Sequence, residues 1–367
     1  METTQGKALA QRRVSLNDLE AFCIQAMLAA GLSEEDARVS ANILATTDSW
    51  GVHTHGTRQI RGLMKNVANG RIRPDALPEV TGEGAAWAVV DGHFAMPMVI
   101  ANRAMSLAME KAKTSGVGFA GVTHSSHFGA AGYYATMALK EDMIGLSMTN
   151  VDRWMTVPGG KGPVLGTNPI AYAIPAGEEH PIFFDIATSN VAVTKILAAK
   201  ALGKNIPAGW LVDDDGLPTT DPSDFPEHGA LLPMAGHKGY GFAVFIEVLS
   251  AVLTGAAMLS EVKCWLDDTM EPANEGHAFI AINVPAMMQI DLFKQRMDHL
   301  IREIKDAPKA KGAERIYLPG EMEWERREKA LANGVQLPDY VTVNLYGLAE
   351  DFGMTEELVS LFHQADK

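Results

Sequence analysis

Apolar residues recur at the three- and four-residue spacing of an α-helix through the first 75 positions of the chain. Leu19, Phe22 and Leu28 follow this spacing after Ser15, a residue type that caps helix N-termini. Ser33 offers a second cap, and the acidic residues that follow it suit the positive end of a helix. The pattern predicts helices over residues 15–32, 33–50 and 57–69.

After residue 85 the pattern changes to short apolar runs that alternate with longer helical ones. Apolar runs of four to eight residues are typical of strands. The expected strands are residues 86–90, 118–122, 144–149, 170–174, 182–184 and 278–284. The expected helices are residues 95–114, 130–139, 191–201, 241–258, 291–305, 321–332 and 355–363. Strands interleaved with helices predict an α/β (α+β) protein with a mixed β-sheet.

The longest apolar run, residues 241–259, is interrupted by Glu247 and has no basic flanks. We therefore expect a buried core helix there and no membrane span. The first 13 residues are polar and lack the apolar centre of a secretion signal. Two cysteines, Cys23 and Cys264, lie far apart and form no CxxC pattern, which predicts a reducing, cytoplasmic location.

Composition is that of an ordinary globular protein, with 47% hydrophobic and 21% charged residues. The formal net charge of -14 would repel the phosphates of nucleic acids and of anionic membranes. We therefore expect neither nucleic acid nor membrane as a partner. A small anionic substrate is still compatible with the chain, because local cations can outweigh a distant net charge.

The most reactive-looking segment follows the expected strand at residues 118–122. A small polar loop there carries His124 and His127 and leads into the expected helix at 130–139. Loops at strand ends often carry reactive side chains on a rigid support. Histidine can accept or donate a proton near neutral pH. The segment is therefore a candidate active site.

A dinucleotide fingerprint, GxGxxG, occurs at residues 116–121. In a Rossmann fold these glycines follow a strand and open a helix whose N-terminus holds the pyrophosphate. Here the expected helix ends before the glycines and a strand follows them, so the order is reversed. The sequence context argues against a Rossmann site.

Two histidine pairs, His53 with His55 and His124 with His127, raise the alternative of a metal-dependent hydrolase. Side chains two apart point nearly opposite ways on a helix, and only an extended segment would aim both at one ion. No further cluster of Asp, His or Cys completes a usual ligand set in the sequence. We expect no bound metal, and the hydrolase is the second hypothesis.

Three further positions suit a bound anion or cofactor. Asp185 ends a very apolar strand, where it either caps the following helix or orients an imidazole or a cofactor group. Lys238 and Gly239 lie at the start of the long apolar run, where an ammonium and helix N–H groups converge. Gly320 and Glu321 open another helix and give a weaker signal of the same kind.

These segments together resemble the malate/L-lactate dehydrogenase family, which is unrelated to the Rossmann-type lactate and malate dehydrogenases. The resemblance runs from Leu16 to Leu337, nearly the whole chain. It is carried by Thr54-His55-Gly56, Ser126-His127-Phe128-Gly129, Ala131-Gly132-Tyr133, Gly166-Thr167-Asn168-Pro169, Asp185-Ile186-Ala187-Thr188-Ser189, Ile206-Pro207-Ala208-Gly209-Trp210, Asp215-Gly216, Pro218-Thr219-Thr220-Asp221-Pro222, Lys238-Gly239-Tyr240-Gly241 and Pro319-Gly320-Glu321.

The resemblance implies a fold and an activity. It implies a non-Rossmann mixed-sheet domain that binds NAD or NADP, plus a helical domain formed by the N-terminal and part of the C-terminal segments. We accordingly divide the chain into a helical domain at residues 1–78, a cofactor and substrate domain at 79–290, and returning C-terminal helices at 291–367. It further implies a homodimer that transfers a hydride between the nicotinamide and a small 2-hydroxy or 2-oxo acid.

The same resemblance assigns site residues. His55 or His127 would transfer the substrate proton, a role that a neutral-pH imidazole suits in both directions of the reaction. Asp185 would assist them or bind the cofactor. The residues that fall where the family binds its cofactor are Asp185, Ile186, Ala187, Lys238, Gly239, Gly320 and Glu321.

The chain departs from the family pattern at the expected substrate contacts, Thr54, Arg58 and Gln59. Many relatives have an arginine four residues after the histidine of the first motif, where this chain has Gln59. Arg58 lies one position earlier, about 100° away if the segment is helical. Either residue is a candidate to hold the substrate carboxylate, and an imino acid substrate or a catalytically lapsed NAD(P)-binding relative remains an alternative.

Overall fold

A computed structural model describes residues 2–267 and 269–364 of the chain. The N-terminal part is helical, as predicted, and the hydroxyls of Ser15 and Ser33 cap α2 and α3 by accepting from the amides of Asp18 and Asp36. The third predicted helix begins with a short 3-10 turn. The elements are α1 (Glu2–Leu9), α2 (Leu16–Ala29), α3 (Glu34–Ser49), η1 (Thr57–Gln59) and α4 (Ile60–Ala68).

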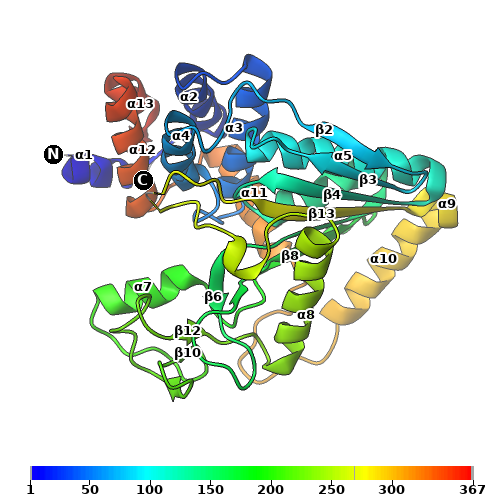
Figure 1. The fold of residues 1–367 in the computed structure, drawn as a ribbon. Helices are drawn as coiled ribbons and strands as arrows, with labels where there is room; N and C mark the ends of the chain where they lie inside the picture. Colours follow the sequence, from blue (N-terminus) through cyan, green and yellow to red (C-terminus); the bar gives the residue numbers. More distant parts are fainter. Residues whose placement is uncertain (1, 268, 365–367) are drawn as a thin grey trace.

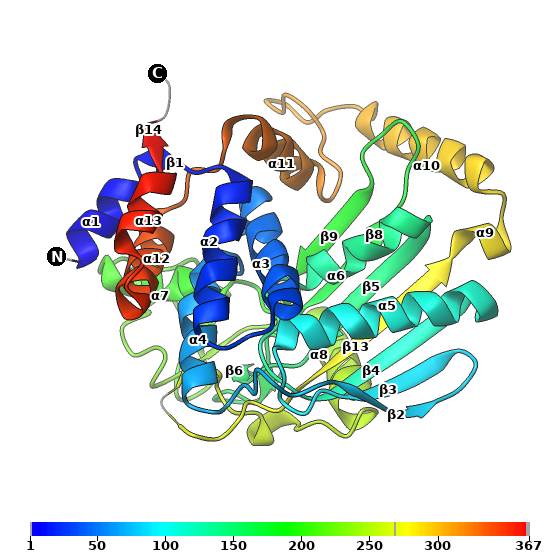
Figure 2. The same cartoon turned by 90° about the horizontal axis from the view of Figure 1, so that it is seen from above.

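A seven-stranded mixed sheet forms the centre, with the strand order β2-β3-β4-β13-β5-β8-β9 (Figure 2). Only β3 and β4 run parallel, and α5 (Pro97–Ser115) connects them. The strands are β2 (Glu79–Glu83), β3 (Trp87–Asp91), β4 (Val117–Ser125), β5 (Met143–Thr149), β8 (Ile170–Ile174), β9 (Ile182–Ile186) and β13 (Glu275–Asn283). All six predicted strands belong to this sheet, which confirms the predicted fold class.

The glycines of the GxGxxG stretch serve packing. Gly116 ends α5 with a φ of 79°, and β4 follows it. A Cβ on Gly118 would lie 2.0 Å from the carbonyl oxygen of Ala108, because α5 lies directly on the strand. The helix-then-strand order is the one that the sequence predicted.

A smaller sheet with the order β11-β10-β12-β6-β7 lies beside α7 and was not predicted from the sequence (Figure 1). Its strands have only two or three residues each, too few for a periodic pattern. The elements of this part are β6 (Arg153–Met155), β7 (Leu165–Gly166), α7 (Val193–Ala201), β10 (Leu211–Val212), β11 (Pro218–Thr219) and β12 (Ala230–Leu231).

The chain returns to the N-terminal helices near its end, and both termini lie on that side of the molecule (Figure 2). α10 (Ile290–Lys305), which follows α9 (Val284–Met287), still packs on the large sheet through Met297 and Ile301. The return begins with α11 (Glu321–Asn333) and continues through α12 (Asp339–Phe352), α13 (Thr355–Leu361) and a two-residue pairing of β1 (Arg12–Arg13) with β14 (His363–Gln364). The three domain ranges themselves stay a prediction.

The long apolar run forms α8 (His237–Glu247) and a π-helical extension, η3 (Val248–Val252), before a short turn η4 (Leu259–Glu261). The expectation of a buried core helix there is wrong. Phe242, Phe245 and Val252 are 50%, 52% and 57% exposed, whereas Glu247 is only 6% exposed. Asn150 and Asn168 donate hydrogen bonds to the Glu247 carboxylate, so the charged residue faces inward and the apolar face outward. Within the described residues, no helix is long and apolar enough to span a membrane.

Candidate functional site

Asp48, at the end of α3, shapes the turn that carries His55. Its buried carboxylate accepts hydrogen bonds from the amide and the hydroxyl of Thr57, at 2.8 and 2.6 Å, and bonds to Nδ1 of His53 at 2.8 Å. A Cβ on Gly56 would lie only 2.4 to 2.7 Å from the atoms of that carboxylate. The turn therefore requires glycine at this position, which explains the Thr-His-Gly motif physically.

His127 lies in the loop between β4 and α6 (Ala131–Met137), and the core behind it is rigid. The ring of Phe128 stacks on that of His277 at 4.4 Å between centroids. His277, from β13, hydrogen-bonds Ser125 through Nε2 at 2.8 Å and Thr149 through Nδ1 at 2.7 Å. These contacts fix the end of β4 and thereby the origin of the histidine loop.

The structure brings His55 and His127 together. Their rings stack with centroids 5.5 Å apart and 29° between planes, although they come from segments more than 70 residues apart. Each ring is largely enclosed yet keeps part of its surface accessible. Burial, then the charge of Arg58, lowers the pKa of His55 to about 4. Burial, followed by His55, His277 and Arg58, holds the pKa of His127 well below its usual value.

The ring contacts and hydrogen bonds of the two imidazoles differ. The amide of Gly129 donates to Nδ1 of His127 at 3.3 Å, which places the proton of the neutral ring on Nε2. Nδ1 of His55 bonds to the Thr54 hydroxyl at 2.9 Å, and this hydroxyl can act as donor or acceptor. The pair can therefore offer one N–H donor and one nitrogen lone pair to a substrate between or beside the rings.

Arg58 and Gln59 are distinguished by their surroundings. Gln59 is 4% exposed, and its Nε2 donates to the carbonyl oxygen of Thr54 at 2.6 Å, so its side chain braces the histidine turn. Arg61 pairs with Asp351 on the surface. The charge of Arg58 acts on both imidazoles, which makes it the cation of this segment that is electrostatically coupled to the pair.

Asp185 lies at the end of β9 and holds the start of α6. Its Oδ2 accepts from the amide of Gly132 at 2.7 Å, and a Cβ on Gly132 would lie 2.3 Å from the ring of Phe183. Asp185 therefore caps α6, which precedes it in the chain, and not α7, which follows it. Burial raises its pKa to about 6, although the Gly132 amide works in the other direction. Within the described residues, Asp185 makes no hydrogen bond to either imidazole.

The other expected cofactor residues lie on three elements. Ile186 ends β9, and Ala187 follows it. Lys238 is exposed in the first turn of α8, while Gly239 is buried there, since a Cβ on it would lie 2.3 Å from the carbonyl oxygen of Met234. Gly320 has a φ of 86°, and a Cβ on it would lie 2.5 Å from the backbone of Phe183. Both glycines therefore allow close backbone packing.

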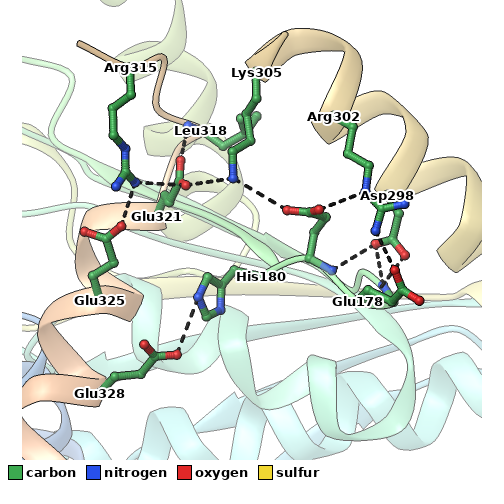
Figure 3. Close-up of polar contacts among 12 residues, drawn as sticks. Glu178, His180, Asp298, Arg302, Lys305, Arg315, Leu318, Glu321, Glu325 and Glu328 are labelled. Atoms are coloured by element: carbon green, nitrogen blue, oxygen red, sulfur yellow. Dashed lines mark hydrogen bonds and ion pairs between the residues drawn. The ribbon is translucent and has the colours of Figure 1, made fainter.

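Glu321 is the centre of an ion cluster at the start of α11 (Figure 3). Its carboxylate accepts from the amide of Leu318 at 3.0 Å and pairs with Lys305 at 3.0 Å and Arg315 at 2.9 Å. Burial alone would raise the pKa of Glu321, but these three partners lower it. The side chain is thus engaged within the protein, where it shapes the turn at Pro319 and Gly320.

The four histidines of the hydrolase hypothesis do not form one cluster. His53 bonds to Asp48, and His124 bonds to Asp91 at 2.9 Å between Nδ1 and Oδ1. Over residues 2–267 and 269–364, no group of three or more His, Cys, Asp and Glu side chains is arranged to hold a metal ion. The donor set that a metal-dependent hydrolase needs is therefore not assembled by these pairs.

Sequence reasoning missed two residues near the histidine loop: Trp265, and Glu275, which pairs in register with Ser125. Trp265 covers the face of His127 at 4.7 Å between centroids. Glu275, at the start of β13, is fully buried, and burial, then Asp152, raises its pKa well above the usual range. Trp265 and Glu275 are more than 130 residues away from His127 in sequence, and no local pattern marks them.

Comparison with known proteins gives concordant matches over nearly the whole chain. Residues 14–345 match the family model described as malate/L-lactate dehydrogenase. A malate/(S)-sulfolactate dehydrogenase of Methanothermus fervidus is 35% identical over 93% of this chain and 98% of its own. A ureidoglycolate dehydrogenase (NAD(+)) of Escherichia coli is 32% identical over 89% of this chain and 93% of its own. The structure of sulfolactate dehydrogenase from Methanocaldococcus jannaschii superposes with a TM-score of 0.86 at 36% identity and covers 93% of this chain and 98% of its own.

Proposed function

We propose a division of labour between His55 and His127 in a chain that belongs to the malate/L-lactate dehydrogenase family. The protein is an NAD(P)-dependent oxidoreductase of small 2-hydroxy and 2-oxo acids. The observation that carries the division of labour is the stacking of the two rings at 5.5 Å, at the junction of the N-terminal helices and the sheet. In this proposal the two imidazoles together handle the proton of the reacting C–O group.

The residues present fit a dinucleotide. Oδ2 of Asp185 accepts a hydrogen bond from the amide of Gly132, whereas Oδ1 accepts none from the described residues. Oδ1 can therefore accept a hydrogen bond from a hydroxyl or amide group of the cofactor. We assign cofactor contacts to Asp185, Ile186, Ala187, Lys238, Gly239 and the turn at Gly320. Glu321 supports that turn through its ion pairs. When bound, the nicotinamide exchanges a hydride with C2 of the substrate.

Proton transfer follows from the tautomers. Nε2–H of His127 donates a hydrogen bond to the substrate oxygen, and His55, oriented by Thr54, accepts the hydroxyl proton during oxidation. Because burial lowers the pKa of both rings, the resting pair is neutral near pH 7, and burial with mutual repulsion limits it to the single proton that it takes from the substrate. In reduction the same proton returns to the oxygen. Arg58 binds the substrate carboxylate, since a guanidinium matches a carboxylate in shape and charge.

A spectrophotometric screen tests this function. The purified protein is mixed with NADH or NADPH and a panel of 2-oxo acids and cyclic imino acids, and oxidation of the nicotinamide is followed. We expect turnover of at least one 2-oxo acid. Binding of NADH without turnover of any compound would instead indicate a catalytically lapsed relative. The comparison of NADH with NADPH decides the cofactor preference.

We also propose that the protein is a homodimer. The outward face of α8, of η3 and of the residue after η3 presents Phe242, Phe245, Val248, Val252 and Leu253, all 44% to 57% exposed. A contiguous apolar face of this kind is typical of a protein contact. Light scattering should give twice the chain mass of 39.5 kDa for the wild type and a monomer for the Phe242→Ser/Phe245→Ser variant. A monomeric wild type would contradict this.

We also propose that the protein is located in the cytoplasm. Cys23 and Cys264 are both free thiols, and burial is the first cause that raises the pKa of each. Free thiols suit a reducing compartment. Cells that express the chain with no added tag or leader are separated into cytoplasmic and other fractions. We expect the NAD(P)-dependent activity in the cytoplasmic fraction.

A further inference from the structure

His127 contacts two rings. The centroid of its ring lies 5.5 Å from that of His55 and 4.7 Å from that of the Trp265 indole, which is tilted by 31° to it. Trp265 is 6% exposed and belongs to the main hydrophobic core. An imidazole in contact with two such rings has little freedom to rotate.

Trp265 is itself held in place by α4, a helix of the N-terminal part of the chain. A Cβ on Gly62 of α4 would lie 3.0 Å from Cζ3 of the indole, so the helix lies against the ring. Nδ2 of Asn66, also in α4, donates to the carbonyl oxygen of Trp265 at 2.9 Å. The helix that follows the His55 turn therefore also braces Trp265, the second ring in contact with His127.

Arg71 adds a guanidinium clamp to this brace. Its side chain is 2% exposed, and it donates to the carbonyl oxygens of Cys264, Asp267 and Glu271 at 2.6, 2.9 and 2.9 Å. It also pairs with the carboxylate of Asp267 at 3.2 Å. A planar fork of five donors can satisfy several carbonyl groups at once, which a lysine cannot do.

We propose that Trp265, held by Arg71 and Asn66, is a positioning residue for His127: it fixes the plane of the His127 ring and offers an aromatic group to that ring when it is protonated. This inference rests on the proposed function, in which His127 handles the substrate proton.

The electrostatic surroundings show why such a group matters. The titratable and charged groups that act on His127 are His55 and Arg58 from the N-terminal segment and His277 from β13, and each disfavours a second positive charge. Among the neighbours of Trp265, Asp267 is paired with Arg71, and Asp152 is hydrogen-bonded to Cys264. The negative face of an indole attracts a cation without adding a titratable group.

The first test uses the protein without cofactor. Nitrogen NMR shifts of a histidine ring report its tautomer, and the His127 signal is assigned by its loss in H127N. At pH 7 we expect one fixed tautomer, protonated on Nε2, in the wild type and in Trp265→Phe. Trp265→Leu should give averaged shifts, and Arg71→Lys intermediate ones. Trp87→Leu, which removes a 47% exposed indole on β3, is the matched control and should resemble the wild type.

The second test is the pH dependence of kcat/KM for reduction of a 2-oxo acid. Without the indole, the alkaline decline should move to lower pH in Trp265→Leu by about half a unit to one and a half units, the range expected of a cation–π contact. Trp265→Phe should shift less than half as far. The kcat should fall on the order of 10- to 100-fold in Trp265→Leu, with the KM for the nicotinamide nearly unchanged.

The outcomes separate the two proposals. A fixed wild-type tautomer in Trp265→Leu, or shifts in Trp87→Leu as large as those in Trp265→Leu, would overturn the positioning role. A uniform loss of activity at every pH in Trp265→Leu, together with an unchanged tautomer, would show a structural role only. If the NMR results hold but the wild type turns over no 2-oxo or imino acid, the positioning role stands and the proposed function fails.

Discussion

Two regions of the molecule bring polar side chains together, and they differ in how they do so. In the first region His55 and His127 contact each other, and His127 also contacts the ring of Trp265. Both imidazoles are buried, and burial lowers the pKa of each. Around Glu321, half-exposed Lys305 and Arg315 pair with a carboxylate. Hydrogen bonds and ion pairs there lower the pKa of Glu321 against its burial and raise that of Lys305. The first region prepares a group to change its charge, whereas the second keeps charges fixed and holds a turn in shape.

The largest effect should come from removing an imidazole. Replacement of His127 or His55 singly by asparagine should lower kcat by about 10²- to 10⁴-fold, the usual range for lost acid–base catalysis. The melting temperature should change little, because asparagine keeps a polar side chain at a partly accessible position. Steady-state kinetics with the best substrate of the screen gives the measurement, and two variants with nearly normal turnover would rule the roles out.

Removal of the positive charge of Arg58 should have the next largest effect on kcat/KM. Arg58→Gln should raise the KM of the acid substrate and lower kcat/KM by about 10- to 100-fold, as expected for a lost hydrogen bond between charged groups. Because the charge of Arg58 lowers the pKa of both imidazoles, removal of this charge should raise both pKa values. The decline in the rate of 2-oxo acid reduction at alkaline pH should then move to higher pH. Gln59→Met is the contrasting variant, since it removes the brace without a change of charge and keeps Arg58. An unchanged KM in Arg58→Gln would contradict the assignment.

A steric change at the histidine turn should have a smaller effect. Gly56→Ala places a Cβ against the Asp48 carboxylate, so the turn or the carboxylate must shift. We expect a loss of about 10-fold in kcat/KM and of about 1–3 kcal/mol in the free energy of unfolding. Gly82→Ala, in β2, is the matched control, because its Cβ would meet only the ring of Trp87 at an ordinary contact distance of 3.6 Å. Equal behaviour of the two variants would show that the turn is not constrained as described.

The smallest effect should come from the ion cluster. Glu321→Gln keeps an acceptor for the Leu318 amide and removes the ion pairs, which lie with half-exposed partners, so we expect a loss of no more than about 1–2 kcal/mol. Since the folded protein lowers the pKa of Glu321, this contribution is present above the ordinary value of 4.5 and is lost as pH falls below it. The difference in melting temperature between wild type and variant should therefore narrow in acid. A constant difference would mean that the charge contributes nothing.

The sequence allowed all strands of the large sheet except β2, the neighbouring helices and the histidine loop to be predicted, because apolar periodicity and N-terminal caps are local signals. It did not predict α12, whose β-branched and aromatic residues are weak helix formers and whose helix is stabilised by packing. It predicted α8 as a buried core helix, which is wrong, because an apolar run does not tell whether the rest of the chain covers both of its sides. Trp265 and Arg71 could not be found, since Arg71 meets the carbonyl oxygen of Cys264 across 193 residues.

The central claim is that His55 and His127 act as one unit on the substrate proton. The measurement that tests it most directly is kcat for H55N, for H127N and for the double variant, with one substrate at one pH. If the rings act together, the double variant should be about as slow as the slower single variant, because groups of one catalytic unit are not additive. A double variant whose loss equals the product of the two single losses would show that the rings act independently and would contradict the account.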